Sequence, residues 1–128
     1  MKERIPSFDI FIESYDFKQV CDIQQKGKIK PSCDIIFNAN NDDLFDLTTI
    51  KIKDIKSPRG LSYAFYKRKG LDEDIAIVNR IIGAYKNNEY VPPLVIDTDD
   101  TIMDGLHRYV AAKEYFGKNG KIKVFKKI

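Results

Sequence analysis

The chain has 128 residues, of which 43% are apolar and 12% aromatic, so it is long enough for one domain with a hydrophobic core. Charged residues make up 32%, which argues against a disordered chain, and the absence of any stretch of about 18 apolar residues excludes a membrane-spanning helix. The net charge of +3 divides into −3 over residues 1–50 and +6 over residues 51–128, and this basic second half suits either a phosphate-bearing partner or an ordinary soluble surface.

The amino-terminal residues carry acids too early for a signal peptide, and no small-residue cleavage site follows them. We therefore expect a cytoplasmic protein. Two cysteines, Cys21 and Cys33, are present without a nearby histidine. A zinc site needs four ligands at tighter spacing, so these residues are expected to be half-buried thiols.

The first half of the chain predicts strands and one helix. Residues 7–13 are rich in aromatic and branched side chains, which is typical of a strand, and residues 33–43 predict a short strand followed by a polar loop. An apolar stripe over residues 17–24, with Gly27 as a stop, predicts a helix. Residues 47–55 alternate between isoleucine and lysine, which indicates a half-buried strand.

The second half alternates more clearly between helices and strands. Residues 57–70 are the least clear segment, because Ser57 and Pro58 could start a helical turn whereas Gly60 and Gly70 favour irregular structure. Residues 71–90 carry the strongest helical pattern of the chain, with acids in its first turn. Residues 91–105 predict a strand, a tight turn and a second strand. A helix over 106–116 and a strand over 121–128 complete the chain. The predicted fold is a single α/β domain with a small mixed sheet and flanking helices.

Five consecutive residues at one predicted strand-to-helix corner carry most of the chemistry: Asp104, Gly105, Leu106, His107 and Arg108. The first amides of a helix are unpaired and attract anions, and a glycine lets a ligand approach the backbone. The arginine matches phosphate oxygens, the histidine can move a proton near neutral pH, and the aspartate can hold a metal or act as a base. The same residues also occur as ordinary solvent-exposed side chains at a helix start.

The stretch from residue 91 to residue 125, "VPPLVIDTDDTIMDGLHRYVAAKEYFGKNGKIKVF", resembles the ParB/sulfiredoxin superfamily. The shared pattern is a proline-bearing strand, a hairpin, a Gly-x-His/Arg-Arg corner, an alanine-rich helix and a closing strand. Upstream, "TIKIKDIKSPRG" is similar to the opening strand and first box of that family, which places Arg59 near the ligand. The resemblance covers residues 47–128 and implies a nucleotide-binding corner, while residues 1–46 have no counterpart.

Departures from the family pattern reduce the number of superfamily activities that this chain could share. Leu106 stands where sulfiredoxins carry their catalytic cysteine, so the protein is not expected to be a sulfiredoxin. His107 replaces the first of two arginines found in chromosome-partition ParB proteins. Asp104 and Arg108 are similar to the free-serine-kinase branch and to ParB-like nucleases, although that kinase branch has a histidine at the position of Leu106.

The first functional hypothesis is therefore a nucleotide-binding protein, with or without Mg²⁺-dependent phosphoryl transfer or hydrolysis. Gly105 and the amides from Leu106 onward would seat the phosphates of a nucleoside triphosphate, ATP or CTP, and His107 and Arg108 would neutralise developing charge. Asp104 would bind Mg²⁺ or accept a proton, which makes Asp104 and His107 the predicted catalytic residues.

Two alternatives remain open. The same corner could grip DNA in a metal-dependent nuclease, although Asp97, Asp99 and Asp100 are better explained as turn residues than as further metal ligands. The chain could also be a non-catalytic module of a phage or mobile element that binds DNA, RNA or a protein. Its basic and aromatic contacts would then come from one segment and the carboxyl-terminal strand: Tyr63, Phe65, Tyr66, Lys67, Arg68, Lys69 and residues 121–128.

Overall fold

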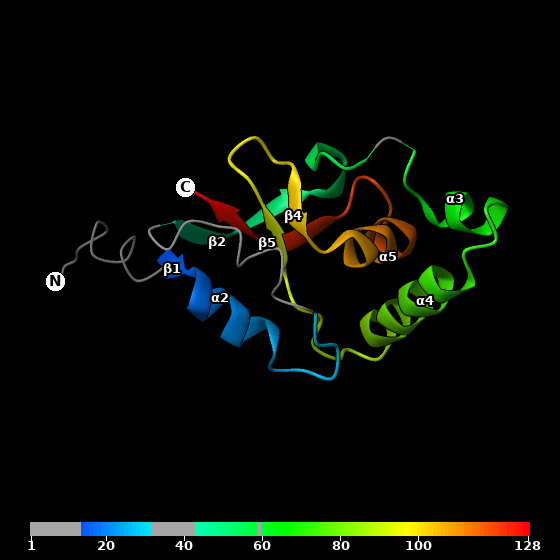
Figure 1. Ribbon diagram of the computed structural model, residues 1–128, viewed down its shortest axis with the longest axis horizontal. Helices are drawn as coiled ribbons and strands as arrows, with labels where there is room; N and C mark the ends of the chain where they lie inside the picture. Colours follow the sequence, from blue (N-terminus) through cyan, green and yellow to red (C-terminus); the bar gives the residue numbers. More distant parts are fainter. Residues whose placement is uncertain (1–13, 32–42, 59) are drawn as a thin grey trace, which may run out of the picture.

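The computed structural model describes most of the chain, namely residues 14–31, 43–58 and 60–128 (Figure 1). The strand predicted over 7–13 and the strand and loop predicted over 33–43 lie outside the described residues, apart from Asp43, as do Cys33 and Arg59. Cys21 is disulfide-bonded, so the expectation of a free thiol is wrong at this residue.

The described residues form four α-helices, one 3-10 turn and five strands. In chain order they are β1 (Ser14–Asp16), α2 (Phe17–Gln24), β2 (Leu44–Lys51), η2 (Ile52–Asp54), α3 (Tyr63–Arg68), α4 (Asp72–Lys86), β3 (Leu94–Ile96), β4 (Ile102–Asp104), α5 (Leu106–Phe116) and β5 (Lys121–Lys127). The helices predicted around α2, α4 and α5 are confirmed, as are the hairpin of β3 and β4 and the closing strand. None of the described helices has the length and apolarity that a membrane span requires.

The strand predicted over residues 47–55 is wrong at its end, because β2 stops at Lys51 and η2 follows. Ile52 is fully buried, and its amide donates to the carbonyl of Gly120 at 2.9 Å. The chain therefore leaves the sheet at Ile52, which belongs to the larger core cluster.

The irregular structure predicted over residues 57–70 is also wrong, because this segment contains α3. The hydroxyl of Ser62 caps the helix by accepting a hydrogen bond from the amide of Phe65 at 3.0 Å. Tyr66 is 5% exposed and packs into the core. The burial of Tyr66 stabilises a six-residue helix that would be marginal in isolation, which explains why the local sequence did not indicate it.

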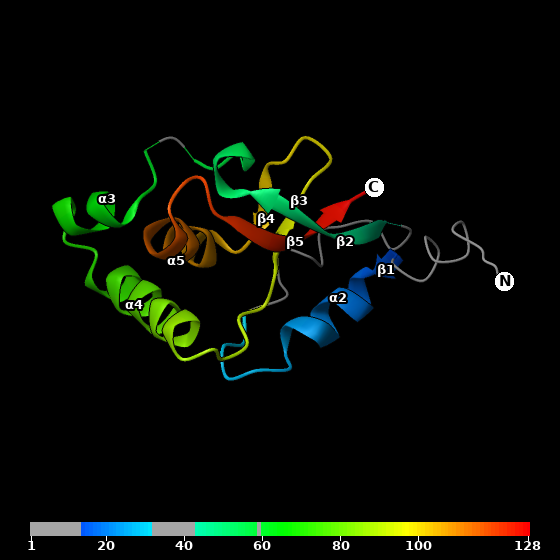
Figure 2. The same ribbon diagram turned by 180° about the vertical axis from the view of Figure 1, so that it is seen from behind.

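The five strands form one mixed sheet in the order β1-β2-β5-β3-β4. The β3–β5 pair is parallel and the other three pairs are antiparallel. Helices lie on both sides of this sheet, α2 on one side and α3, α4 and α5 toward the other (Figures 1 and 2). The predicted α/β class with a small mixed sheet is therefore confirmed.

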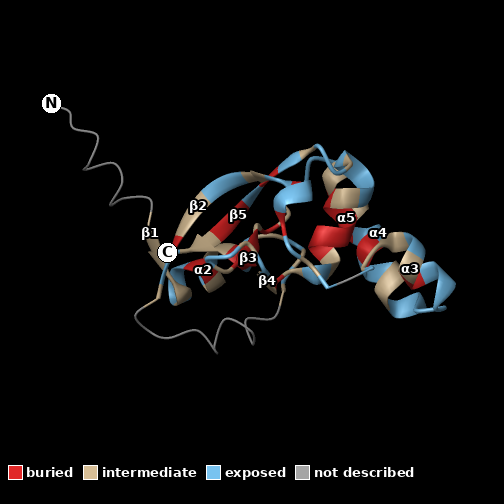
Figure 3. Ribbon diagram, turned by 90° about the horizontal axis from the view of Figure 1, so that it is seen from above, coloured by how far each residue is buried: buried red, intermediate tan, exposed pale blue. Residues whose placement is uncertain are grey.

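Two groups of buried side chains hold the helices to the sheet, as the alternation along β3 illustrates. Leu94 and Ile96 belong to the larger group under α4 and α5, whereas Val95 belongs to the smaller group under α2. All three are essentially inaccessible because both faces of this short strand are covered. Buried positions accordingly concentrate in β3, β5 and the inner sides of α4 and α5, while β2 is partly exposed (Figure 3).

Candidate functional site

The candidate site begins where β4 ends and α5 starts. Gly105 is the residue before the helix and adopts a left-handed conformation with φ 111° and ψ 35°, which favours glycine. The first hydrogen bond inside α5 runs from the amide of Tyr109 to the carbonyl of Gly105 at 2.8 Å. The amides of Leu106, His107 and Arg108 therefore have no acceptor within the helix, and Gly105 has no side chain to cap them.

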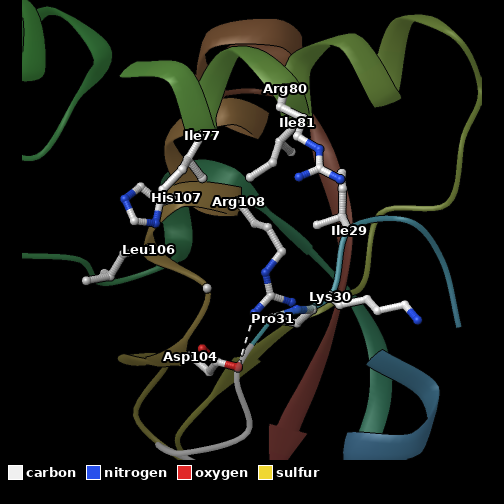
Figure 4. A pocket seen from close by; sticks show the side chains of 11 residues that line it. Ile29, Lys30, Pro31, Ile77, Arg80, Ile81, Asp104, Leu106, His107 and Arg108 are labelled. Carbon is white, nitrogen blue, oxygen red and sulfur yellow. Dashed lines mark ion pairs between the residues drawn. The ribbon is translucent and has the colours of Figure 1, made fainter. Parts of the chain in front are cut away.

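Arg108 lies almost entirely inside the protein, with 3% of its surface exposed. Its Nη1 donates to the carbonyl oxygens of Pro92 at 3.1 Å and Pro93 at 2.7 Å. Its Nη2 lies 3.2 Å from Oδ2 of Asp104, one helical turn earlier in the chain (Figure 4). The guanidinium therefore joins the end of β4 to the segment that enters β3.

This arrangement changes the roles expected for three residues of the corner. Burial lowers the pKa of Arg108, and the nearby carboxylate of Asp104 opposes that shift by favouring the charged form. A Cβ atom on Gly105 would lie 3.0 Å from Nη2 of Arg108 and 3.0 Å from Cγ of Leu94. Side chains of the protein therefore fill the space beside Gly105, where a ligand was expected from the sequence.

Nη2 of Arg108 has fewer hydrogen-bond acceptors than a buried donor needs. Although Nη2 of Arg108 is ion-paired with Asp104, it makes no hydrogen bond of good geometry to any described residue. A buried donor of this kind is costly unless an acceptor or water reaches it. Arg108 also lines the cavity described below, so the expected contact between its guanidinium and an anion stays a prediction that the geometry permits.

His107 is held by α4 rather than by its own helix. Its Nε2 lies 2.6 Å from Oδ1 of Asp74, in the first turn of α4, and both side chains are about one-third exposed. The ring of Tyr66 lies beside the imidazole with centroids 6.0 Å apart. Asp74, together with burial, raises the pKa of Tyr66, burial being the larger cause. The amino-terminal ends of α4 and α5 are therefore joined through a carboxylate–imidazole pair.

A cavity of about 420 Å³ opens at the corner, between α5, α4 and the segment after α2 (Figure 4). The five predicted corner residues all line it, and the others come from elsewhere: Ile29, Lys30, Pro31, Ile77, Arg80 and Ile81. The guanidinium of Arg80 lies beside Ile29 and Ile81, whereas the side chain of Lys30 extends away from Asp104 (Figure 4). The structure thus brings the predicted residues together, except Arg59, which lies outside the described residues.

The wall formed by residues 29–31 was not predicted. The sequence offered one signal for it, since Gln24 falls on the apolar stripe of α2 and a buried amide needs a partner. That partner is the carbonyl of Pro93, which accepts from Nε2 of Gln24 at 2.8 Å and also from Arg108. The otherwise unmatched amino-terminal part is therefore attached to the same point as the corner arginine.

The acidic hairpin does not contribute to the cavity. Asp97 accepts a hydrogen bond from the amide of Thr98 at 2.7 Å, and Asp99 accepts one from the amide of Thr101 at 3.1 Å. Asp100 has φ 70° and pairs with Lys126 at 2.8 Å. These residues form the turn at the opposite end of β4 from Asp104, as predicted, and the described residues contain no group of three or more potential metal ligands.

The basic segment around α3 differs from the binding surface considered for a nucleic-acid module. Tyr66 is buried, and Phe65 packs against the core. The hydroxyl of Tyr63 donates to Oδ1 of Asn79 at 2.8 Å, and Lys67 lies over its ring at 5.0 Å. These aromatic side chains mostly attach α3 to the rest of the molecule.

Comparisons with known proteins add one distant likeness. No protein-family model matches the chain, and no curated protein matches it either. Among solved structures it is similar to the C2221 form of a Pnob8-like ParB-N domain, with 16% identity and a TM-score of 0.44. The match covers 65% of this chain and 29% of that one, so this chain spans under a third of that protein.

Proposed function

We propose that the cavity at the β4–α5 corner binds a small phosphate-bearing molecule, and that a nucleotide is the best candidate. The observation that carries the proposal is the convergence of three kinds of group around one cavity of ligand size. These are the unpaired amides at the start of α5, basic side chains from three elements and an apolar wall. A volume of about 420 Å³ lies within the range usual for small-molecule sites.

The phosphate would lie against the amides of Leu106 and His107. Leu106 and His107 both line the cavity, and the positive end of the helix dipole favours an anion there. Arg80 contributes an exposed guanidinium to the cavity lining, and its hydrogen bond to the carbonyl of Lys28 is a long one of 3.2 Å. The charge of Asp104 is offset by that of Arg108, so this carboxylate contributes little repulsion toward an anion.

The remaining part of the ligand would lie on the apolar wall. Ile29, Ile77 and Ile81 line the same cavity, and Ile77 is 44% exposed although it belongs to a helix with a buried side. A flat base or a comparable apolar group would cover these side chains and remove them from water. An inorganic phosphate would leave them uncovered, which separates a nucleotide site from a bare anion site.

A resident metal does not fit this cavity well. Among the described residues, Asp104 supplies the one carboxylate that lines it, and that carboxylate is already ion-paired with Arg108. Mg²⁺ usually binds through one or two carboxylates together with substrate phosphates, so it would have to arrive with a nucleoside triphosphate such as ATP or CTP. If the ligand is turned over, His107 is the group best placed to move a proton, because Asp74 orients its ring.

The test is a binding screen with a matched pair of variants. Thermal unfolding of the full chain is measured with inorganic phosphate and with ATP, CTP, GTP and UTP, each with and without Mg²⁺. A ligand at about 100 times its Kd stabilises the folded state by about 2.7 kcal/mol, which raises Tm by roughly 10 °C for a chain of this size.

Arg80→Ala should reduce the shift, because a hydrogen bond to a charged group contributes about 1.5–3 kcal/mol. The control Lys67→Ala removes an equal charge from α3, away from the cavity, and should leave the shift unchanged. If no nucleotide raises Tm, or if both variants lose the shift equally, the proposal is wrong. If inorganic phosphate raises Tm and no nucleotide does, the site binds a simple anion and the nucleotide proposal is wrong.

A further inference from the structure

A second surface, far from the corner along α5, combines exposed aromatic rings with lysines. It surrounds a cavity of about 380 Å³ where α4 and α5 end and β3 and β5 begin. Tyr85, Tyr90 and Phe116 line this cavity together with Lys121 and Lys123. The aromatic contacts expected from the sequence lie on α3 instead, so this surface emerges only from the folded chain.

The aromatic part consists of three rings packed against one another. Tyr85 and Tyr115 are stacked, with centroids 5.8 Å apart and planes 6° apart. Phe116 meets them edge-on, at 4.9 Å from Tyr85 and 4.8 Å from Tyr115. Despite these contacts, Tyr115 remains 41% exposed and Phe116 43% exposed. Two large rings therefore present a face or an edge to solvent at the end of α5.

The basic part lies on the neighbouring sheet. Lys121 and Lys123 alternate with the buried Ile122 and point to the face of the sheet opposite α4 and α5. The β2–β5 register places Lys51 opposite Lys121, so the side chains of these two lysines share one face. Helix α2 covers that face only farther along, where Phe125 is buried.

These lysines have no carboxylate partner among the described residues. The ion pairs of β5 involve Lys126 and Lys127 at its other end, whereas Lys121, Lys123 and Lys51 are exposed. Glu89 is the one acidic side chain that lines the cavity. The lysine side chains leave the sheet on the face opposite α4 and α5, but Lys121 and Lys123 also line the cavity at the start of β5 together with Phe116. The basic part therefore meets the aromatic part at this end of the sheet, and three lysines outweigh the single charge of Glu89.

We propose that this aromatic–lysine surface binds single-stranded nucleic acid. An unpaired base would stack on the exposed ring of Tyr115 or enter the cavity beside Phe116, and the backbone phosphates would run along the lysines of β5 and β2. Stacking on aromatic rings requires bases that are free of a duplex, which favours a single strand over double-stranded DNA. An acidic peptide could pair with the lysines, but its carboxylates would make no stacking contact with the aromatic rings. The inference does not depend on the nucleotide proposed at the corner.

Fluorescence anisotropy with a labelled oligothymidine of about 12 nucleotides, at about 50 mM salt, tests the proposal. Tyr115→Ala should weaken binding at least about fivefold, as expected for loss of one stacked base. Lys121→Glu with Lys123→Glu should weaken it further. The matched control, Lys67→Glu with Lys69→Glu on α3, makes the same change in net charge and should have less than about a twofold effect.

Unlabelled duplex DNA and polyglutamate serve as competitors, and circular dichroism verifies that each variant is folded. Cross-linking of an oligonucleotide carrying 5-iodouracil, followed by mass spectrometry, should identify the peptide that contains Tyr115 and Phe116. The proposal is overturned if the oligonucleotide does not bind, if the control pair weakens binding equally, or if Tyr115→Ala has no effect. Displacement by duplex or by polyglutamate at equal concentration would also overturn it.

Discussion

Arg108 and Asp104 form an ion pair beneath the corner that the sequence singled out, with Nη2 of the arginine 3.2 Å from Oδ2 of the aspartate. The same guanidinium donates to the carbonyls of Pro92 and Pro93, which precede β3. A single side chain therefore connects β4, α5 and the entry to β3. This contact holds the end of β4 beside the start of α5, whose first residues line the cavity.

Removing Arg108 should therefore be severely destabilising. Arg108→Met removes the buried guanidinium that pairs with Asp104 and donates to the carbonyls of Pro92 and Pro93, which costs about 3–5 kcal/mol. Urea denaturation of Arg108→Met, Asp104→Leu and the double variant measures the coupling. The double variant should lose clearly less stability than the sum of the single ones, because it removes both charges of the buried pair together. Simple additivity would contradict the pairing.

Gly105 should not tolerate a side chain. Gly105→Ala combines a positive φ with contacts of 3.0 Å to Arg108 and Leu94, so we expect a loss of more than about 1 kcal/mol. Gly83→Ala is the matched control, because Gly83 lies within α4 with nothing within 4 Å of the added Cβ. That control should stabilise the protein by up to about 1 kcal/mol. Equal responses in thermal denaturation would show that the corner is not constrained as described.

Asp74 should oppose anion binding at α5. Its carboxylate contacts His107 at the start of that helix, so Asp74→Ala removes a negative charge from the proposed phosphate position. We expect a severalfold increase in nucleotide affinity by calorimetry and a loss of stability below about 1 kcal/mol, since the pair is about one-third exposed. Asp72→Ala removes an equally charged side chain from the same turn of α4 and should have a smaller effect. A weaker affinity in Asp74→Ala would indicate that His107 must be oriented before it can bind the ligand.

Tyr85 should make stability depend on pH in the alkaline range. Burial raises its pKa from 10.0 to about 12, and the charge of Arg108 opposes that shift only partly. Because the pKa is higher in the folded state, the stabilisation is complete below about pH 10 and is lost as pH rises toward about pH 12. Tyr85→Phe should remove about 2 kcal/mol of this decline. Denaturation midpoints of both proteins between pH 9 and pH 12 measure the difference, and parallel curves would contradict the assignment.

The pattern of apolar residues determined the helices and most of the strands. The stripe over residues 71–90 becomes α4, the helical pattern before Gly117 becomes α5, and the strand predicted after it becomes β5. The corner was visible as well, because a glycine between an apolar run and a helical pattern is a local signal. In α3 the pattern failed, since the stabilising contact of Tyr66 is with distant residues.

The function of individual side chains at the corner depended on contacts that no local pattern encodes. The sequence placed Arg108 one turn after Asp104 but did not indicate that its guanidinium would turn inward to Pro92 and Pro93. It likewise could not show that α4 would supply Asp74 and Arg80, or that residues 29–31 would form a wall. The sequence by itself thus determined which elements form and where an anion site could begin. The tertiary structure decided which side chains reach that site. A buried charge is costly unless it is paired, and its partners come from whichever elements pack against it.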